Sequence, residues 1–179
     1  MNFVTGGVPD AFIQQAIEIR KDRDRRYRNI YKEEVSDLRW VGEIGEICFD
    51  KWLKINTTLP VKWITEDVAG SADFLIGDTS VGMKTVKRKG PVGPGFTAQI
   101  TARHAEEPVD HFFFASYIYP RKELQLLGGI TRADFLGAAI YHGAGSRVHS
   151  HYTVRKGHEI YNIEIEELTP PLKWISSLG

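Results

Sequence analysis

One stretch of the chain constrains the fold more than any other. Residues 111–119 have the sequence His-Phe-Phe-Phe-Ala-Ser-Tyr-Ile-Tyr and are almost wholly apolar. A strand with one face in water alternates apolar and polar side chains, whereas a strand covered on both faces is apolar throughout. These residues therefore predict a central strand in a sheet that is covered on both sides.

The surrounding pattern predicts an α/β fold in which helices flank a mixed central sheet. Residues 61–87 predict an antiparallel meander, because a turn at 77–80 separates two of its short strands. A glycine- and proline-rich loop is expected at 89–95. We expect one domain over 1–179, with an N-terminal helical segment at 1–35 and a core at 36–179. Helices are expected at 9–35, 36–54 and 131–141, and strands at 61–65, 72–76, 81–87, 96–102, 124–130 and 159–168.

Composition excludes several classes of protein. Lys plus Arg and Asp plus Glu are both 23, so the net charge of zero gives no global argument for a polyanionic partner, although local patches remain open. The longest apolar runs are shorter than a membrane helix requires, so no membrane partner is expected. The lone cysteine, Cys48, cannot form an internal disulfide. Together with the absence of a signal-peptide pattern, this leads us to expect a cytoplasmic location.

The most charged segment lies in the first expected helix. Residues 20–28 contain six basic and two acidic side chains. One interpretation is a solvated helix face crossed by salt bridges. The other is a face that follows the phosphates of a nucleic acid, with Tyr27 and Tyr31 among the charges.

A second group of charges lies on elements that are otherwise apolar. Glu43 and Glu46 share a narrow stripe of the second expected helix, beside two glycines. Each glycine costs about 1 kcal/mol in a helix interior, which suggests close approach by another backbone or a ligand. Asp73 and Lys84 lie on the two strands of the expected hairpin, whose turn would bring them close together. Charges in such positions need a partner or a metal ion.

These elements resemble the PD-(D/E)XK nuclease superfamily, whose fold is called restriction-endonuclease-like. The matching segments are Gly42-Glu43-Ile44-Gly45-Glu46 on the helix, Ala72-Asp73-Phe74 on the aspartate strand and Met83-Lys84-Thr85 on the next strand. The resemblance implies a Mg²⁺-dependent DNA endonuclease, with Mn²⁺ able to replace Mg²⁺. It implies Glu46, Asp73 and Lys84 as catalytic residues, with Glu43 as the alternative to Glu46. The implied metal ligands are Glu46, Asp73 and the backbone carbonyl of Met83.

One position departs from the family pattern. The residue two places before Lys84 is Gly82, where the family has Asp or Glu as a metal ligand. Three interpretations stay open: a carboxylate borrowed from Glu43 or Glu46, a protein of the same fold that binds nucleic acid without cutting it, or a variant whose acid was removed. The type of DNA substrate and the choice between exonuclease and endonuclease stay open too.

Basic residues near the end of the second hairpin strand are the expected contacts to DNA phosphates. An exposed strand end without such a role is the alternative. The residues are Lys87, Arg88, Lys89 and Arg103. Because many members of the superfamily act as dimers, a homodimer is also open.

Overall fold

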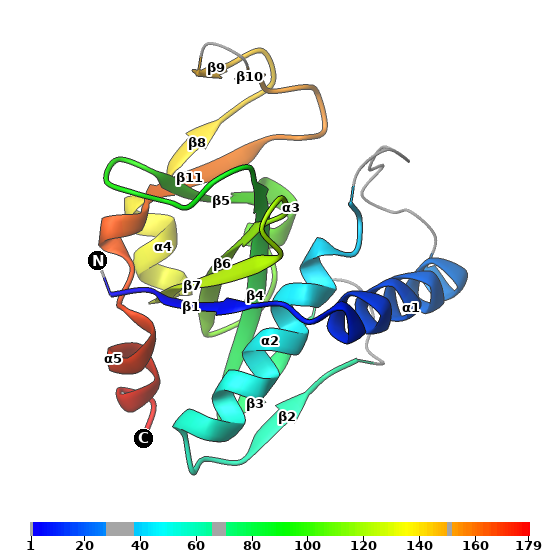
Figure 1. Cartoon of the computed structure of the whole chain (residues 1–179). Helices are drawn as coiled ribbons and strands as arrows, with labels where there is room; N and C mark the ends of the chain where they lie inside the picture. Colours follow the sequence, from blue (N-terminus) through cyan, green and yellow to red (C-terminus); the bar gives the residue numbers. More distant parts are fainter. Residues whose placement is uncertain (1, 28–37, 66–70, 150–151) are drawn as a thin grey trace.

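The computed structural model describes residues 2–27, 38–65, 71–149 and 152–179. Its largest sheet has six strands and is mixed, because β4 and β6 run parallel while the other neighbours are antiparallel. The strand order is β1 (Val4–Gly7), β7 (Glu123–Thr131), β6 (His111–Ile118), β4 (Thr79–Arg88), β3 (Phe74–Ile76), β2 (Val61–Trp63). Figure 1 shows this sheet as the centre of an α/β fold, with helices packed around it.

Two smaller sheets and five helices complete the described part of the chain. One sheet has the order β5 (Thr97–Thr101), β11 (Ile160–Glu164), β8 (Ile140–His142), and the other pairs β9 (Arg147–His149) with β10 (Tyr152–Thr153). The helices are α1 (Asp10–Tyr27), α2 (Val41–Asn56), α3 (Ala102–Ala105), α4 (Arg132–Ala138) and α5 (Pro171–Ser176), with a 3₁₀ turn η1 at Ile165–Glu167.

The apolar strand β6 is buried on both faces, which confirms the prediction made from its sequence. Phe113 packs against Phe49 of α2, with 4.4 Å between ring centroids. Phe112 and Phe114 point to the opposite face and pack against Phe135 of α4. The sheet therefore separates two hydrophobic cores.

The predicted meander at 61–87 is confirmed as β2–β3–β4, and the loop expected at 89–95 has neither helix nor strand. The first helix begins at Asp10; residues 28–35 of that prediction lie outside the described residues. The second helix begins at Val41 and ends at Asn56, so the expected bounds of 36–54 were wrong at both ends. Ser36, its expected cap, is also outside the described residues.

Other predicted bounds were wrong because tertiary packing overrides local pattern. The helix expected to reach Tyr141 ends at Ala138, and the next residues pair with β11 as strand β8. The strand expected at 159–168 ends at Glu164 and continues as η1. The short elements β1, α3, β9, β10 and α5 were not predicted from the sequence.

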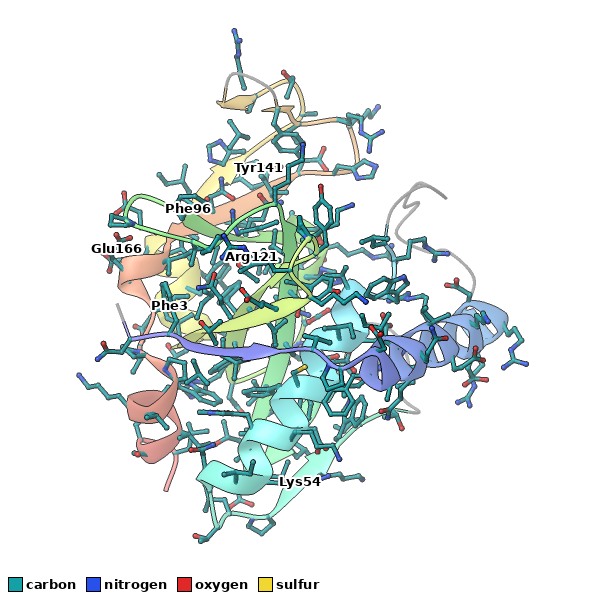
Figure 2. All side chains as sticks on the ribbon, in the orientation of Figure 1. Phe3, Lys54, Phe96, Arg121, Tyr141 and Glu166 are labelled. Atoms are coloured by element: carbon teal, nitrogen blue, oxygen red, sulfur yellow. The ribbon has the colours of Figure 1, made fainter. Side chains whose placement is uncertain are left out.

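Figure 2 shows the side chains on this fold, with Lys54 near the lower end of the view and Tyr141 in its upper part. None of the helices in the described residues has the length and apolar character needed to cross a membrane.

Candidate functional site

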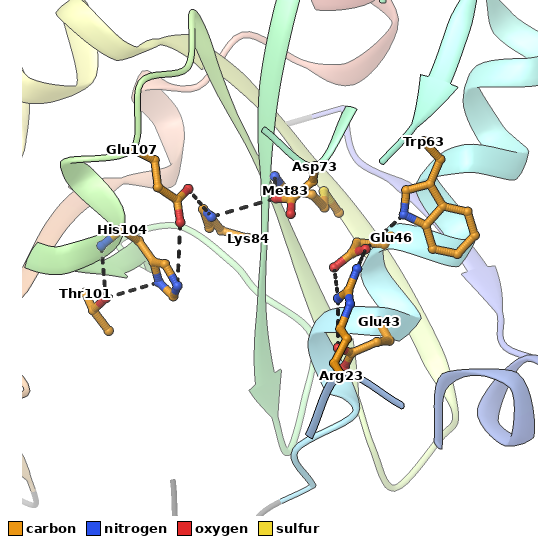
Figure 3. A network of polar contacts seen from close by, with 10 residues as sticks. All are labelled: Arg23, Glu43, Glu46, Trp63, Asp73, Met83, Lys84, Thr101, His104 and Glu107. Carbon is orange, nitrogen blue, oxygen red and sulfur yellow. Dashed lines mark hydrogen bonds and ion pairs between the residues drawn. The ribbon is translucent and has the colours of Figure 1, made fainter. Parts of the chain in front are cut away.

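The β3–β4 hairpin positions the first two residues of the candidate site. Phe74 pairs with Val81, so Asp73 lies just before β3, beside Gly82. The Asp73 amide donates to the Val81 carbonyl at 3.0 Å, and the Met83 amide donates to Asp73 Oδ2 at 2.7 Å. These bonds hold the carboxylate next to β4, where Lys84 Nζ lies 3.8 Å from Asp73 Oδ2 (Figure 3).

A third residue, Glu107, completes this cluster. Its Oε2 accepts a hydrogen bond from Lys84 Nζ at 2.6 Å, and both side chains are largely buried. The ammonium group of Lys84 therefore has a carboxylate on each side, one from Asp73 and one from Glu107.

Glu107 also stands beside the glycine that breaks the family pattern. A Cβ atom at Gly82 would lie 3.4 Å from Glu107 Oε2, 3.4 Å from Lys84 Cε and 3.2 Å from a ring carbon of Phe112. A Cβ atom on Gly82 would thus have a Glu107 oxygen among its three nearest neighbours, and no atom of Glu43 or Glu46.

Sequence reasoning missed Glu107 because nothing in its local pattern marks it. The signal that could have found it is the parallel pairing of β4 with β6, in which Val81 is opposite His111. The segment that precedes β6 must then reach the start of β4, and Glu107 lies on that segment.

His104 is the neighbour of Glu107 on the side away from Lys84. Its Nε2 lies 3.7 Å from Glu107 Oε1, and its Nδ1 is 3.1 Å from Thr101 Oγ1. Thr101 is also the N-cap of α3 and accepts from the His104 amide. Burial, helped by the positive charges of Lys84 and Arg103, lowers the pKa of His104 to about 3, so its imidazole is neutral at pH 7.

The environment of Asp73 opposes its ionisation. Burial raises the pKa of Asp73 to about 7, Lys84 acts against this rise, and the Glu46 and Glu107 carboxylates add to it. A cation placed among these carboxylates would favour the ionised form. The acidic stripe of α2 lies near the hairpin, because α2 packs directly against β4 where Gly45 meets Thr85.

The two glutamates of α2 are held by arginines of α1. Arg23 donates to both oxygens of Glu46, at 2.8 and 2.7 Å, and Trp63 Nε1 donates to the same carboxylate at 2.9 Å. Glu43 is fully buried and lies 2.6 Å from Arg20 and 2.9 Å from Arg23. Arg20 and Arg23 are therefore salt-bridged, as one interpretation of the charge run expected, but the solvated face of that interpretation was wrong for these two, because they are only 21% and 20% exposed and their partners are buried.

The four predicted phosphate contacts have different surroundings. Lys87, Lys89 and Arg103 are exposed. The Arg88 guanidinium instead donates to Ser116 Oγ at 3.0 Å and to the Thr97 carbonyl at 2.6 Å, and it lies 5.3 Å from the centre of the Phe96 ring. Arg88 thus holds β5 and β6 to β4, while Arg103 is the predicted contact next to His104.

Within the described residues, no three or more His, Cys, Asp or Glu side chains form a group arranged to hold a metal ion. The site has two carboxylates around one ammonium, with a third carboxylate bound by Arg23. No protein-family model, curated protein or solved structure matches this chain.

Proposed function

We propose that this protein is a Mg²⁺-dependent DNA endonuclease of the PD-(D/E)XK type, with a restriction-endonuclease-like core, in which Glu107 replaces the acid missing at Gly82. The observation that supports it is the Glu107 carboxylate, which stands beside Gly82 and 2.6 Å from Lys84. Asp73, Lys84 and Glu107 then provide the residue types of the family's strand motif, with one acid supplied by a different segment.

The donor set suits the proposed ion. Mg²⁺ prefers oxygen ligands, keeps several waters and is commonly bound by one or two carboxylates. Asp73 and Glu107 would hold it, with the backbone carbonyl of Met83 as the further ligand that the resemblance implies. Glu46, bound by Arg23 and Trp63, is less suited to direct ligation than the sequence predicted.

When bound, the ion supplies charge neutralisation at the phosphate and activation of a water molecule. The chain's own residues prepare the site for this chemistry. The Met83 amide fixes the Asp73 carboxylate, and Lys84 brings three N–H donors to orient a water or a phosphate oxygen. The neutral His104, held by Thr101, borders Glu107.

Cleavage of supercoiled plasmid with Mg²⁺ or Mn²⁺ tests the proposal. We expect the unchanged chain to cut, and Asp73→Asn, Lys84→Met and Glu107→Gln to lose at least about 100-fold in rate. Glu106→Gln is the matched control, because Glu106 is the adjacent, exposed glutamate. If Glu107→Gln cuts as fast as the control, Glu107 does not have the proposed role.

A relocation experiment tests the replacement of the acid directly. Adding Gly82→Asp to the Glu107→Gln chain places a carboxylate next to the vacated position, so we expect part of the lost activity to return. In the unchanged chain, Gly82→Asp puts two carboxylates against each other and should slow cleavage. Failure of the double variant to recover any activity, while it remains folded by circular dichroism, would count against the relocation.

The alternative is a nucleic-acid-binding module of the same fold that does not cut. Two features favour this alternative. Gly82 provides no carboxylate at the family's metal-ligand position, and Arg23 binds both oxygens of Glu46, so fewer carboxylates remain to bind a metal ion. Salt-sensitive DNA binding by the unchanged chain, without cleavage under any metal condition, would select this alternative.

A further inference from the structure

A basic arm, residues 140–158, projects from the core. In Figure 1 it leaves the core at β8, forms the β9–β10 hairpin and returns at β11, at the end of the molecule opposite α5. The Gly145 amide donates to the Val154 carbonyl at 2.8 Å, and the Val154 amide donates to the Ser146 carbonyl at 2.9 Å. Residues 150 and 151, which follow β9 in the sequence, lie outside the described residues.

The charge of the basic arm differs from that of the whole chain. Residues 140–158 contain three Arg and Lys side chains and no Asp or Glu, although the whole protein has a net charge of zero. The three cations, Arg147, Arg155 and Lys156, are exposed. The next acid along the chain is Glu159, so residues 140–159 have three cations and one carboxylate, and this net positive charge favours a polyanion.

Aromatic surface lies at the base of the same arm. Tyr141 on β8 is 53% exposed, and its ring lies 5.2 Å from that of Tyr161 on β11 (Figure 2). An exposed aromatic ring can stack on a base, and so adds to the contacts that cations make with phosphates.

The base of the arm adjoins the candidate active site. Ile160 of β11 pairs with Thr101, and the Ala102 amide donates to the Glu159 carbonyl at 2.8 Å. The segment that begins with Thr101 and Ala102 continues to His104 and then to Glu107. A ligand lying along the arm would thus lead to the Asp73–Lys84–Glu107 cluster.

The architecture of the hairpin also points to an external ligand. Within the described residues, β9 and β10 pair with each other and with no other strand. A two-stranded hairpin is marginally stable by itself in water. Val154, directly after β10, is buried and anchors the base of the hairpin, and contacts with a ligand would add to the order of the β9–β10 pair.

We propose that the basic arm binds the sugar-phosphate backbone of a nucleic acid that flanks the active site. Arg147 and Arg155 can each give paired hydrogen bonds to a phosphate, and Lys156 adds a point charge. The identification of this ligand as the substrate rests on the proposed nuclease function, whereas binding by the arm does not.

The test measures DNA affinity as a function of salt, using the full chain, a fluorescent DNA duplex and EDTA to prevent cleavage. The arm variant is R147Q/R155Q/K156Q. The matched control, K51Q/K62Q/K173Q, removes three exposed lysines from α2, β2 and α5. Both variants lose the same charge, so only the position of that charge differs.

Between about 50 and 200 mM salt, log affinity falls with log salt concentration. We expect the magnitude of this slope to be smaller by about 2–3 for the arm variant than for the unchanged chain. The control should keep the slope of the unchanged chain. An arm variant with an unchanged slope, or a control that flattens equally, would overturn the proposal. Single changes at Arg155 and Lys156, each expected to lower the slope by about 1, replace the triple variant if its thermal unfolding shows a lost fold.

The two proposals fail separately. If the plasmid is not cut but the arm variant shows the flattened slope, the binding arm stands and the nuclease function falls. If Glu107→Gln abolishes cutting but the arm variant keeps the normal slope, the nuclease function stands and the arm proposal falls.

Discussion

At the residue scale, the two glycines of α2 have different reasons to be glycine. A Cβ atom on Gly45 would overlap the hydroxyl of Thr85 and lie 2.9 Å from Thr85 Cβ, whereas a Cβ on Gly42 would meet nothing within 4 Å. The close approach that the sequence suggested for both is therefore made by β4 at Gly45 alone. This contact lets α2 lie directly against the strand that carries Lys84.

Substitution by alanine separates these two cases. Gly45→Ala forces α2 and β4 apart and should lower the free energy of unfolding by roughly 1–3 kcal/mol. Gly42→Ala has room for the methyl group and should raise stability by up to about 1 kcal/mol, because alanine is the better helix former. Urea unfolding of both variants measures the difference, and equal effects would contradict the close approach at Gly45.

At the element scale, α1 is joined to α2 by charges. Arg23, 20% exposed, contacts both Glu46 and the fully buried Glu43. Burial raises the pKa of Glu43, and Arg20 opposes that rise. The arginines make burial of these carboxylates tolerable, since a buried charge without a partner is costly.

Two substitutions on α1 compare the stability contributed by a buried ion pair with that contributed by an exposed one. Arg23→Met keeps the length of the side chain but leaves Glu46 and Glu43 undercompensated, so we expect a loss of about 2–4 kcal/mol. Lys21→Met breaks the ion pair between Lys21 and Glu18, whose side chains are 63% and 67% exposed. This change should alter stability by less than about 0.5 kcal/mol. Denaturant unfolding compares them, and a small effect of Arg23→Met would mean that water already solvates the α2 carboxylates.

At the scale of the whole molecule, α5 closes one of the two cores against the central sheet. Trp174 is buried among Phe49, Phe113 and His111, and its Nε1 donates to His111 Nδ1 at 3.2 Å. Gly129 on β7 leaves the space that this indole occupies. His111 must be unprotonated at Nδ1 to accept the bond.

This contact predicts a loss of stability in acid. Burial lowers the pKa of His111, and Asp110 and Asp134 act against that effect. The unfolded chain therefore binds the proton more readily, so the contribution of His111 is present above pH 6.5 and decreases as pH falls below it.

Thermal unfolding at about pH 7.5 and about pH 5.5 tests this dependence. His111→Asn offers an amide oxygen that accepts from Trp174 at either pH, so its melting temperature should fall less than that of the unchanged chain. Part of the fall will remain, because the pKa of His104 is also lowered by burial. An identical fall in both proteins would contradict the role of His111.

The sequence by itself determined the elements whose pattern is local. The apolar run of β6, the meander at 61–87 and the acidic stripe of α2 follow from side-chain periodicity and turn residues, which depend on neighbours along the chain. The same local patterns identified Asp73 and Lys84 as charges on apolar strands. The hairpin turn that brings these two together is short enough to be predicted.

Only the tertiary structure decided which charges meet. Parallel pairing of β4 with β6 brings Glu107 beside Gly82, and packing of α1 on α2 gives Glu46 to Arg23. Partners 23 residues apart leave no periodic trace in the sequence. Their contacts arise because buried charges must find compensation wherever packing brings an opposite charge within reach.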